Sequence, residues 1–196
     1  CDGERLGNVC DVDFEIKTGR ICNLIIPGPC KVLGILGRDQ EYIISYEQIQ
    51  RLRAAGLIYD AHIMTGIAGR GRGLENAEAT AEFFNRTRPE RIINFSLFLM
   101  AGTPLYEDAK AGRFFPASEL ENLEEERRLL QLMEWEGQRA AYDGFHDCIT
   151  FRVRGRLPGE KEKMLGKLDG AIKVWKEKEP VFAWAERIPD AVILKE

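Results

Sequence analysis

The sequence lacks any long apolar run. Its longest candidate, NFSLFLM at residues 94–100, has the length of a strand, whereas a helix needs about 20 apolar residues to cross a bilayer. We therefore expect a cytoplasmic protein with no membrane partner.

Closely spaced cysteines are also missing. Cys1, Cys10, Cys22, Cys30 and Cys148 form neither a CxxC pair nor a CxxxCxxC triplet. Zinc and iron–sulfur sites usually take their ligands from such groups, because a short loop positions several thiolates on one metal. We expect reduced thiols and no metal site.

Positive charge is scarce as well. The 28 lysines and arginines are outnumbered by 32 acidic residues, which gives a formal net charge of -4. A mildly acidic chain has no overall attraction for a phosphate backbone, since such binding needs clustered Lys and Arg. We expect no nucleic-acid partner.

The first fifty residues predict a β meander. Residues 9–16 alternate apolar and polar side chains, the KTG sequence at 17–19 supplies a turn, and residues 20–28 return as a second strand. Another alternating segment follows at 41–49.

Later segments alternate between strand and helix patterns. A buried type of strand is expected at 61–67, a helix at 74–87 and a further strand at 91–100. Ser118 and Glu121 form a capping box that opens a long helix. This order favours parallel strands joined by crossover helices, and therefore an α/β fold.

Several charged residues invite a functional interpretation. Segment 119–128, ELENLEEERR, is expected to form the exposed side of its helix. The alternation in FRVRGRL places Arg152, Arg154 and Arg156 on one face of a strand. That face could receive a phosphate or carboxylate, or it could be a solvated edge whose charge discourages aggregation.

The two histidines are weaker candidates. His146 stands between Asp143 and Asp147, a spacing at which a carboxylate could orient the imidazole or a metal could bind weakly. The alternative is that one histidine makes no site. His62 lies in a strand pattern and is expected to be structural.

Residues 187–196 return to a strand pattern. Removing residues 52–186 joins this tail to the first β segment. We therefore predict that an α/β unit at 52–186 interrupts a β unit made of 1–51 and 187–196, because chain ends held close together can accept an inserted domain. A tandem arrangement, in which the tail strand belongs to the second unit, is the alternative.

The β segments resemble the small PRC-barrel proteins of sporulating bacteria. The resemblance lies in DGERLGNVCDVDFEIKTGRICNLIIPG at 2–28, GRDQEYIISYEQI at 37–49 and DAVIL at 190–194. It implies a small PRC-like β-barrel that works as an interaction module rather than as an enzyme.

The inserted unit resembles the C-terminal half of a radical S-adenosylmethionine enzyme, of the group related to oxygen-independent coproporphyrinogen oxidase and the elongator catalytic subunit. The matching segments are HIMTGIAG at 62–69, LENAEATAEFFNRTRPERI at 74–92 and LFLMAGTPLYEDAKAG at 97–112. The resemblance implies a partial (β/α) barrel.

The same resemblance implies a set of cofactor-binding residues. In that family the corresponding loop approaches the adenosine part of S-adenosylmethionine, and the next strand end lies near the adenine. The positions implied here are Thr65, Gly66, Ile67, Ala68, Gly69, Leu99 and Met100. The glycine-rich loop does not match a P-loop, because no Gly-Lys-Ser or Gly-Lys-Thr closes it, and ordinary turn chemistry remains the alternative.

The chain lacks the cysteine motif that holds the family's [4Fe-4S] cluster, so no catalytic residue is assigned. Our main hypothesis is a half-barrel able to bind S-adenosylmethionine that is inactive or depends on a cluster-bearing partner chain, and a homo-oligomer would also cover its open edge. The alternatives are a non-enzymatic PRC-barrel interaction module linked to sporulation and a chimeric chain without evolved function. Whether the chain is an enzyme stays open at this point.

Overall fold

The computed structural model describes residues 11–14, 21–27, 41–45 and 58–185, together with residues 48, 51 and 56. It divides into two compact units, Cys1–Ile58 and Tyr59–Glu196, which are described separately below. The closing strand predicted at 187–196 lies outside the described residues. The domain boundaries drawn from the sequence stay predictions.

The first unit contains a three-stranded antiparallel sheet. Its strands are β1 (Asp11–Phe14), β2 (Ile21–Pro27) and β3 (Glu41–Ser45), in the order β1-β2-β3. This order confirms the predicted meander. The turn predicted at 17–19 lies outside the described residues.

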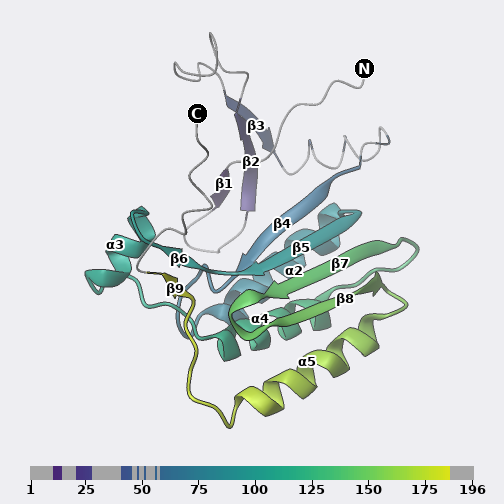
Figure 1. Ribbon diagram of the computed structural model, residues 1–196. Coiled ribbons are helices and arrows are strands. Elements are labelled where there is room, and N and C mark those ends of the chain that lie inside the picture. Colours follow the sequence, from purple (N-terminus) through teal and green to yellow (C-terminus); the bar gives the residue numbers. More distant parts are fainter. Residues whose placement is uncertain are drawn as a thin grey trace, which may run out of the picture. The chain divides into compact units, whose positions relative to one another are not determined.

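The second unit is built on a four-stranded sheet with the order β4-β5-β7-β8 (Figure 1). Strands β4, β5 and β7 are parallel, and β8 runs antiparallel to β7. In chain order the elements are β4 (Asp60–Thr65), α2 (Gly73–Thr87), β5 (Arg91–Ser96), β6 (Leu99–Met100), α3 (Pro104–Lys110), α4 (Glu119–Leu132), β7 (Ala140–His146), a 3-10 turn (Asp147–Ile149), β8 (Phe151–Leu157), α5 (Lys161–Trp175) and β9 (Trp184–Ala185).

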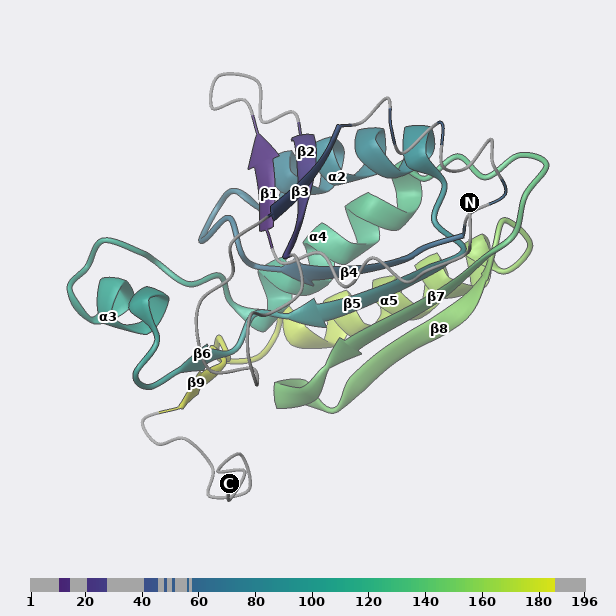
Figure 2. The same cartoon turned by 90° about the horizontal axis from the view of Figure 1, so that it is seen from above.

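Helices α2, α4 and α5 pack on the same face of this sheet (Figures 1 and 2). One core joins Phe84 of α2, Leu123 of α4 and Leu168 of α5 to Ile92 and Val153 of the sheet. Consecutive parallel strands that step in one direction place their right-handed crossover helices on one side. The predicted α/β class is confirmed at this level, and the described strands form an open sheet rather than a closed barrel.

The long helix α4 begins with the predicted capping box. The backbone N–H of Ser118 donates to Glu121 Oε2 at 2.8 Å, and the N–H of Glu121 donates to Ser118 Oγ at 3.3 Å. This reciprocal pair satisfies two amides that a helix start leaves open. None of the helices within the described ranges has the length and apolar character needed to cross a membrane.

The Gly-Thr-Pro-Leu-Tyr sequence starts the short helix α3. Thr103 caps it by accepting the N–H of Tyr106 at 3.3 Å, and Pro104 occupies the first helical position. Proline suits that position because its missing N–H would be unpaired there in any case. Tyr106 is buried with Leu97 and Leu99 in a small second core.

The strand expected at 91–100 is two strands. β5 ends at Ser96, and β6 pairs with β9 in a separate two-stranded parallel sheet, where Leu99 N–H donates to Ala183 O at 2.9 Å. Leu99 is buried in the second core, away from the main sheet. The apolar run alone did not show this break.

Candidate functional site

The glycine loop after β4 is held by carboxylates from α4. Gly66 N–H donates to Glu125 Oε2 at 2.9 Å, and Gly71 N–H donates to Glu121 Oε1 at 2.9 Å. Thr65 is buried, and its hydroxyl donates to the Phe95 carbonyl at 3.2 Å. Two amides that a ligand could use are therefore already bonded within the protein.

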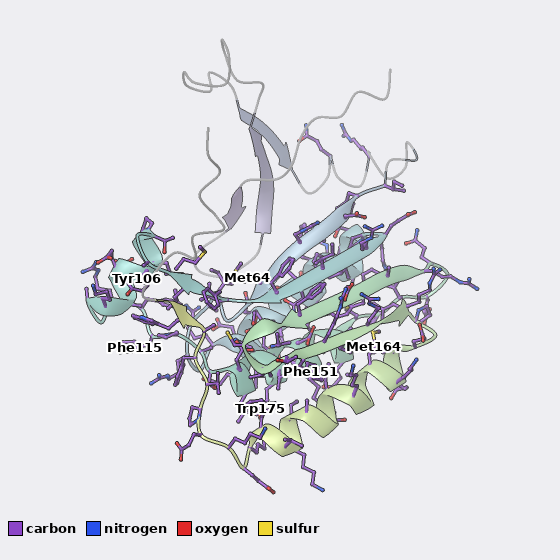
Figure 3. All side chains as sticks on the ribbon, viewed as in Figure 1. Met64, Tyr106, Phe115, Phe151, Met164 and Trp175 are labelled. Carbon is purple, nitrogen blue, oxygen red and sulfur yellow. The ribbon has the colours of Figure 1, made fainter. Side chains whose placement is uncertain are left out.

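The close approaches that require glycine are also internal. Gly66 has a φ of +83°, and a Cβ there would lie 2.5 Å from Asn122 Oδ1. Gly69 has a φ of +85°, and its Cβ would lie 3.0 Å from the Phe115 carbonyl oxygen; Figure 3 labels Phe115. The small residues thus make room for α4 and for the segment before it.

The remaining predicted cofactor residues differ in exposure. Ile67 is 48% exposed, Ala68 and Met100 are half-buried, and Leu99 is buried. Phe114 connects the glycine loop to the strand end at Leu99. It packs against the second core, which contains Leu99, and it lies 3.2 Å from a Cβ placed on Gly69. The structure therefore links the loop to the Leu99 strand end, and the cofactor role of these positions stays a prediction.

Helix α4 buries acidic residues. Glu119, Asn122, Leu123, Glu125 and Glu126 are at most 2% exposed, so the expectation that segment 119–128 is the exposed side of its helix is wrong for these five. Burying a carboxylate is costly unless hydrogen bonds or an opposite charge compensate it. Burial raises the pKa of Glu125, although hydrogen bonds from Asn76 and Gly66 oppose the rise.

His146 supplies the compensating charge. Its Nδ1 lies 2.9 Å from Glu119 Oε2 and its Nε2 lies 2.9 Å from Glu126 Oε2, with all three side chains fully buried. A neutral imidazole has one N–H, so two carboxylate partners favour the doubly protonated ring. Burial alone would lower the pKa of His146, but these two carboxylates raise it to about 9.

Two further groups complete the cluster around Glu126. Its Oε1 accepts the Tyr142 hydroxyl at 2.8 Å and the Asn94 amide at 3.0 Å. Burial and the adjacent carboxylate hold the pKa of Tyr142 well above its usual range. Gly144 leaves the room for this carboxylate, because a Cβ there would overlap Glu126.

This group of side chains, here called the α4 charge cluster, comprises Glu119, Glu126, His146, Tyr142 and Asn94, and it was not predicted from the sequence. The carboxylates expected beside His146 were Asp143 and Asp147, and the Asp143 side chain lies on the other face of β7. A helical projection was the available signal, since positions 119, 123, 126 and 130 share one face of α4. Within the described ranges, no three His, Cys, Asp or Glu side chains are arranged to hold a metal.

The face of the sheet opposite the helices carries three cross-strand rows. Strand pairing sets the first as Asp60, Arg91, Ala141 and Arg156, the second as His62, Ile93, Asp143 and Arg154, and the third as Met64, Phe95, Phe145 and Arg152. Parallel sheets usually bury both faces. Here the second face carries no helix of the described unit, and we call it the open face.

The third row is mostly apolar. The Phe95 and Phe145 rings stack with centroids 5.4 Å apart and an interplanar angle of 12°, and the Arg152 guanidinium lies 4.0 Å from the Phe145 centroid. Met64, labelled in Figure 3, is 39% exposed. His62 lies beside Phe95 at 6.4 Å and is exposed rather than buried.

The three arginines of β8 share the open face, as the alternation predicted. Arg152 forms two hydrogen bonds to Asp143 at 2.7 and 2.6 Å, and these lower the pKa of Asp143. Two backbone groups of β8 are hydrogen-bonded by side chains of α5 and its N-cap residue. Lys167 Nζ donates to the Arg152 carbonyl at 2.6 Å, and Glu160 accepts the Arg156 N–H at 3.0 Å. The outer edge of β8 is therefore partly protected against pairing with another strand.

Part of the chain is similar to a known protein. No family model matches the chain. A 51-residue segment is 35% identical to the probable sporulation protein YlmC of Bacillus subtilis (strain 168), which is of PRC-barrel type. The match covers 26% of this chain and 63% of the relative's length. The chain is thus similar over 51 residues to a sporulation protein of PRC-barrel type. The assignment of this resemblance to the β segments and the radical S-adenosylmethionine lineage stay predictions.

Proposed function

We propose that the chain is a non-enzymatic interaction protein linked to sporulation. Its PRC-type β segment makes the contacts, and its α/β unit serves as a scaffold. The similarity of 51 residues to a sporulation protein supports this class of function. The main hypothesis drawn from the sequence, a half-site for S-adenosylmethionine, becomes the second candidate.

One observation in the α/β unit favours a scaffold over a cofactor site. The amides of Gly66 and Gly71 are bonded to Glu125 and Glu121 of the same chain. A ligand at this loop would have to replace hydrogen bonds that involve carboxylates, which are stronger than neutral ones. The loop is thus arranged to fix α4 against β4.

Calorimetric titration of the whole chain with S-adenosylmethionine tests the proposal, together with iron and sulfide analysis after anaerobic reconstitution. We expect no saturable heat at millimolar ligand and no stoichiometric iron. Saturable binding that is lost in Ile67→Asp and kept in Leu74→Asp would overturn the proposal. Both side chains are exposed, at 48% and 55%, so neither change should disturb the fold.

A second candidate, the partner-dependent half-barrel, is favoured by the strand order. Three parallel strands carry α2 and α4 on one face, and no described strand pairs with the outer edge of β4. A cluster-bearing partner could add strands at that edge. Formation of 5′-deoxyadenosine under reducing conditions, only when the chain is mixed with a radical enzyme's N-terminal half, would establish this function instead.

A further inference from the structure

We propose that the open face holds a binding site for a small organic phosphate, at the end of the sheet where β4, β5 and β7 begin. A hollow of about 550 Å³ lies there. The side chains that carry the argument are Arg91, Ile93, Ala141, Arg154, Arg156 and Lys163. The proposal goes beyond the interaction function and does not depend on it.

Strand register explains why this hollow exists. Arg91 and Arg156 lie on either side of Ala141 in the first cross-strand row. Neighbouring strands are about 4.8 Å apart, so the two arginine Cα atoms are separated by roughly 10 Å. The short side chain of Ala141 therefore leaves a depression between the long side chains of Arg91 and Arg156. Ile93, in the second row, forms the adjoining part of its base, here called the floor.

The cations around the hollow are only loosely neutralised. Arg91 lies 3.4 Å from Asp60, and Arg154 lies 3.4 Å from Asp143, whose closer partner is Arg152. Such exposed pairs contribute little and exchange readily.

The remaining charges also leave the hollow positive. Lys163 pairs with Glu160 at 3.2 Å. The same carboxylate accepts the Arg156 N–H at 3.0 Å and attracts the Arg156 side chain, so one carboxylate serves two cations. In total, four cationic and two anionic side chains line the hollow. This excess is local, because the whole chain is acidic.

The ligand class follows from this arrangement. A phosphate monoester carries about two negative charges at neutral pH and offers oxygens that guanidinium groups bind in pairs. The positive end of α5, which begins at Lys161, adds to the attraction. The uncharged part of the ligand would lie over Ala141 and Ile93.

Phenyl phosphate and inorganic phosphate are suitable probes, titrated into the whole chain at pH 7 and low salt. We expect saturable binding of phenyl phosphate that weakens as salt is added. Arg91→Ala and Arg156→Ala should each weaken it at least tenfold. Arg113→Ala should leave it unchanged, because that exposed arginine pairs with Asp108 outside the hollow.

Two further variants separate a built site from a merely positive surface. Ala141→Leu fills the hollow above residue 141 without changing its charge and should weaken phenyl phosphate binding at least tenfold. Arg156→Lys keeps the positive charge and replaces Arg156→Ala if that variant does not fold. Failure of phenyl phosphate to saturate at millimolar concentration, or unchanged binding in Ala141→Leu, overturns the proposal. Equal affinity for the two probes overturns the organic part of the ligand assignment.

Discussion

The Nε2 atom of His146 lies 2.9 Å from a carboxylate oxygen of Glu126, and neither side chain is exposed to solvent. The pair joins the last residue of β7 to the middle of α4. Glu119 holds the other ring nitrogen at the same distance. One imidazolium therefore ties the sheet to the first two turns of this helix.

Replacing His146 tests how much this connection stabilises the fold. His146→Gln leaves Glu119 and Glu126 buried without an opposite charge, and we expect a loss of about 3–5 kcal/mol in the free energy of unfolding. The measurement is urea denaturation followed by tryptophan fluorescence, because all three tryptophans lie between residues 135 and 184. His62→Gln, at an exposed position, is the control and should change stability by less than about 0.5 kcal/mol. Equal effects of the two changes would contradict the role given to His146.

The same cluster makes stability depend on pH. The pKa of His146 is raised from 6.5 to about 9 in the folded protein. A raised histidine pKa means that the folded state holds the proton more tightly, so its stabilisation is complete below pH 6.5 and is lost as the pH rises through 9. The shift corresponds to about 3 kcal/mol. Urea midpoints measured from pH 6 to pH 10 should fall in the wild-type chain.

His146→Gln is the comparison for this pH series. It removes the titrating group, so the part of the slope that belongs to His146 should disappear between pH 6.5 and pH 9. Wild-type and variant curves that run parallel across that range would show that the imidazole does not hold its proton more tightly when folded.

Much of the framework could be predicted from local patterns. The capping box of Ser118 and Glu121 and the helix at 74–87 depend on neighbouring residues, and both are present. The common face of Arg152, Arg154 and Arg156 follows from strand alternation alone.

The α4 charge cluster could not be predicted in the same way. A helical projection places Glu126 on the leucine face of α4, but the sequence does not show that His146 and Tyr142, far along the chain, reach it across the core. The hollow of the open face was equally hidden, since Arg91 and Arg156 come together only through the pairing of β5, β7 and β8. Local sequence carries no information on such register.

Gly144 provides a test of the space that Glu126 needs. A Cβ at Gly144 would overlap the Glu126 carboxylate, so Gly144→Ala must displace a group bonded to His146 and Tyr142. We expect a loss of about 3 kcal/mol, from overpacking and broken buried hydrogen bonds. The matched control is Gly166→Ala on the exposed side of α5, where a Cβ meets nothing within 4 Å. That change should stabilise the chain by about 0.5–1 kcal/mol, because alanine favours a helix over glycine.

Gly66 and Gly71 separate backbone strain from close packing in the loop. Both have positive φ, at +83° and +76°, so alanine at either position costs about 1–2 kcal/mol. A Cβ at Gly71 meets nothing within 4 Å, whereas one at Gly66 would lie 2.5 Å from Asn122 Oδ1. Gly66→Ala should therefore be the more destabilising change, by a further 1–3 kcal/mol or so. Urea denaturation without any ligand measures the difference. If the two variants were equally stable, the approach of α4 to the loop would not be what requires glycine at position 66, and a requirement imposed by a bound ligand would regain its place as the explanation.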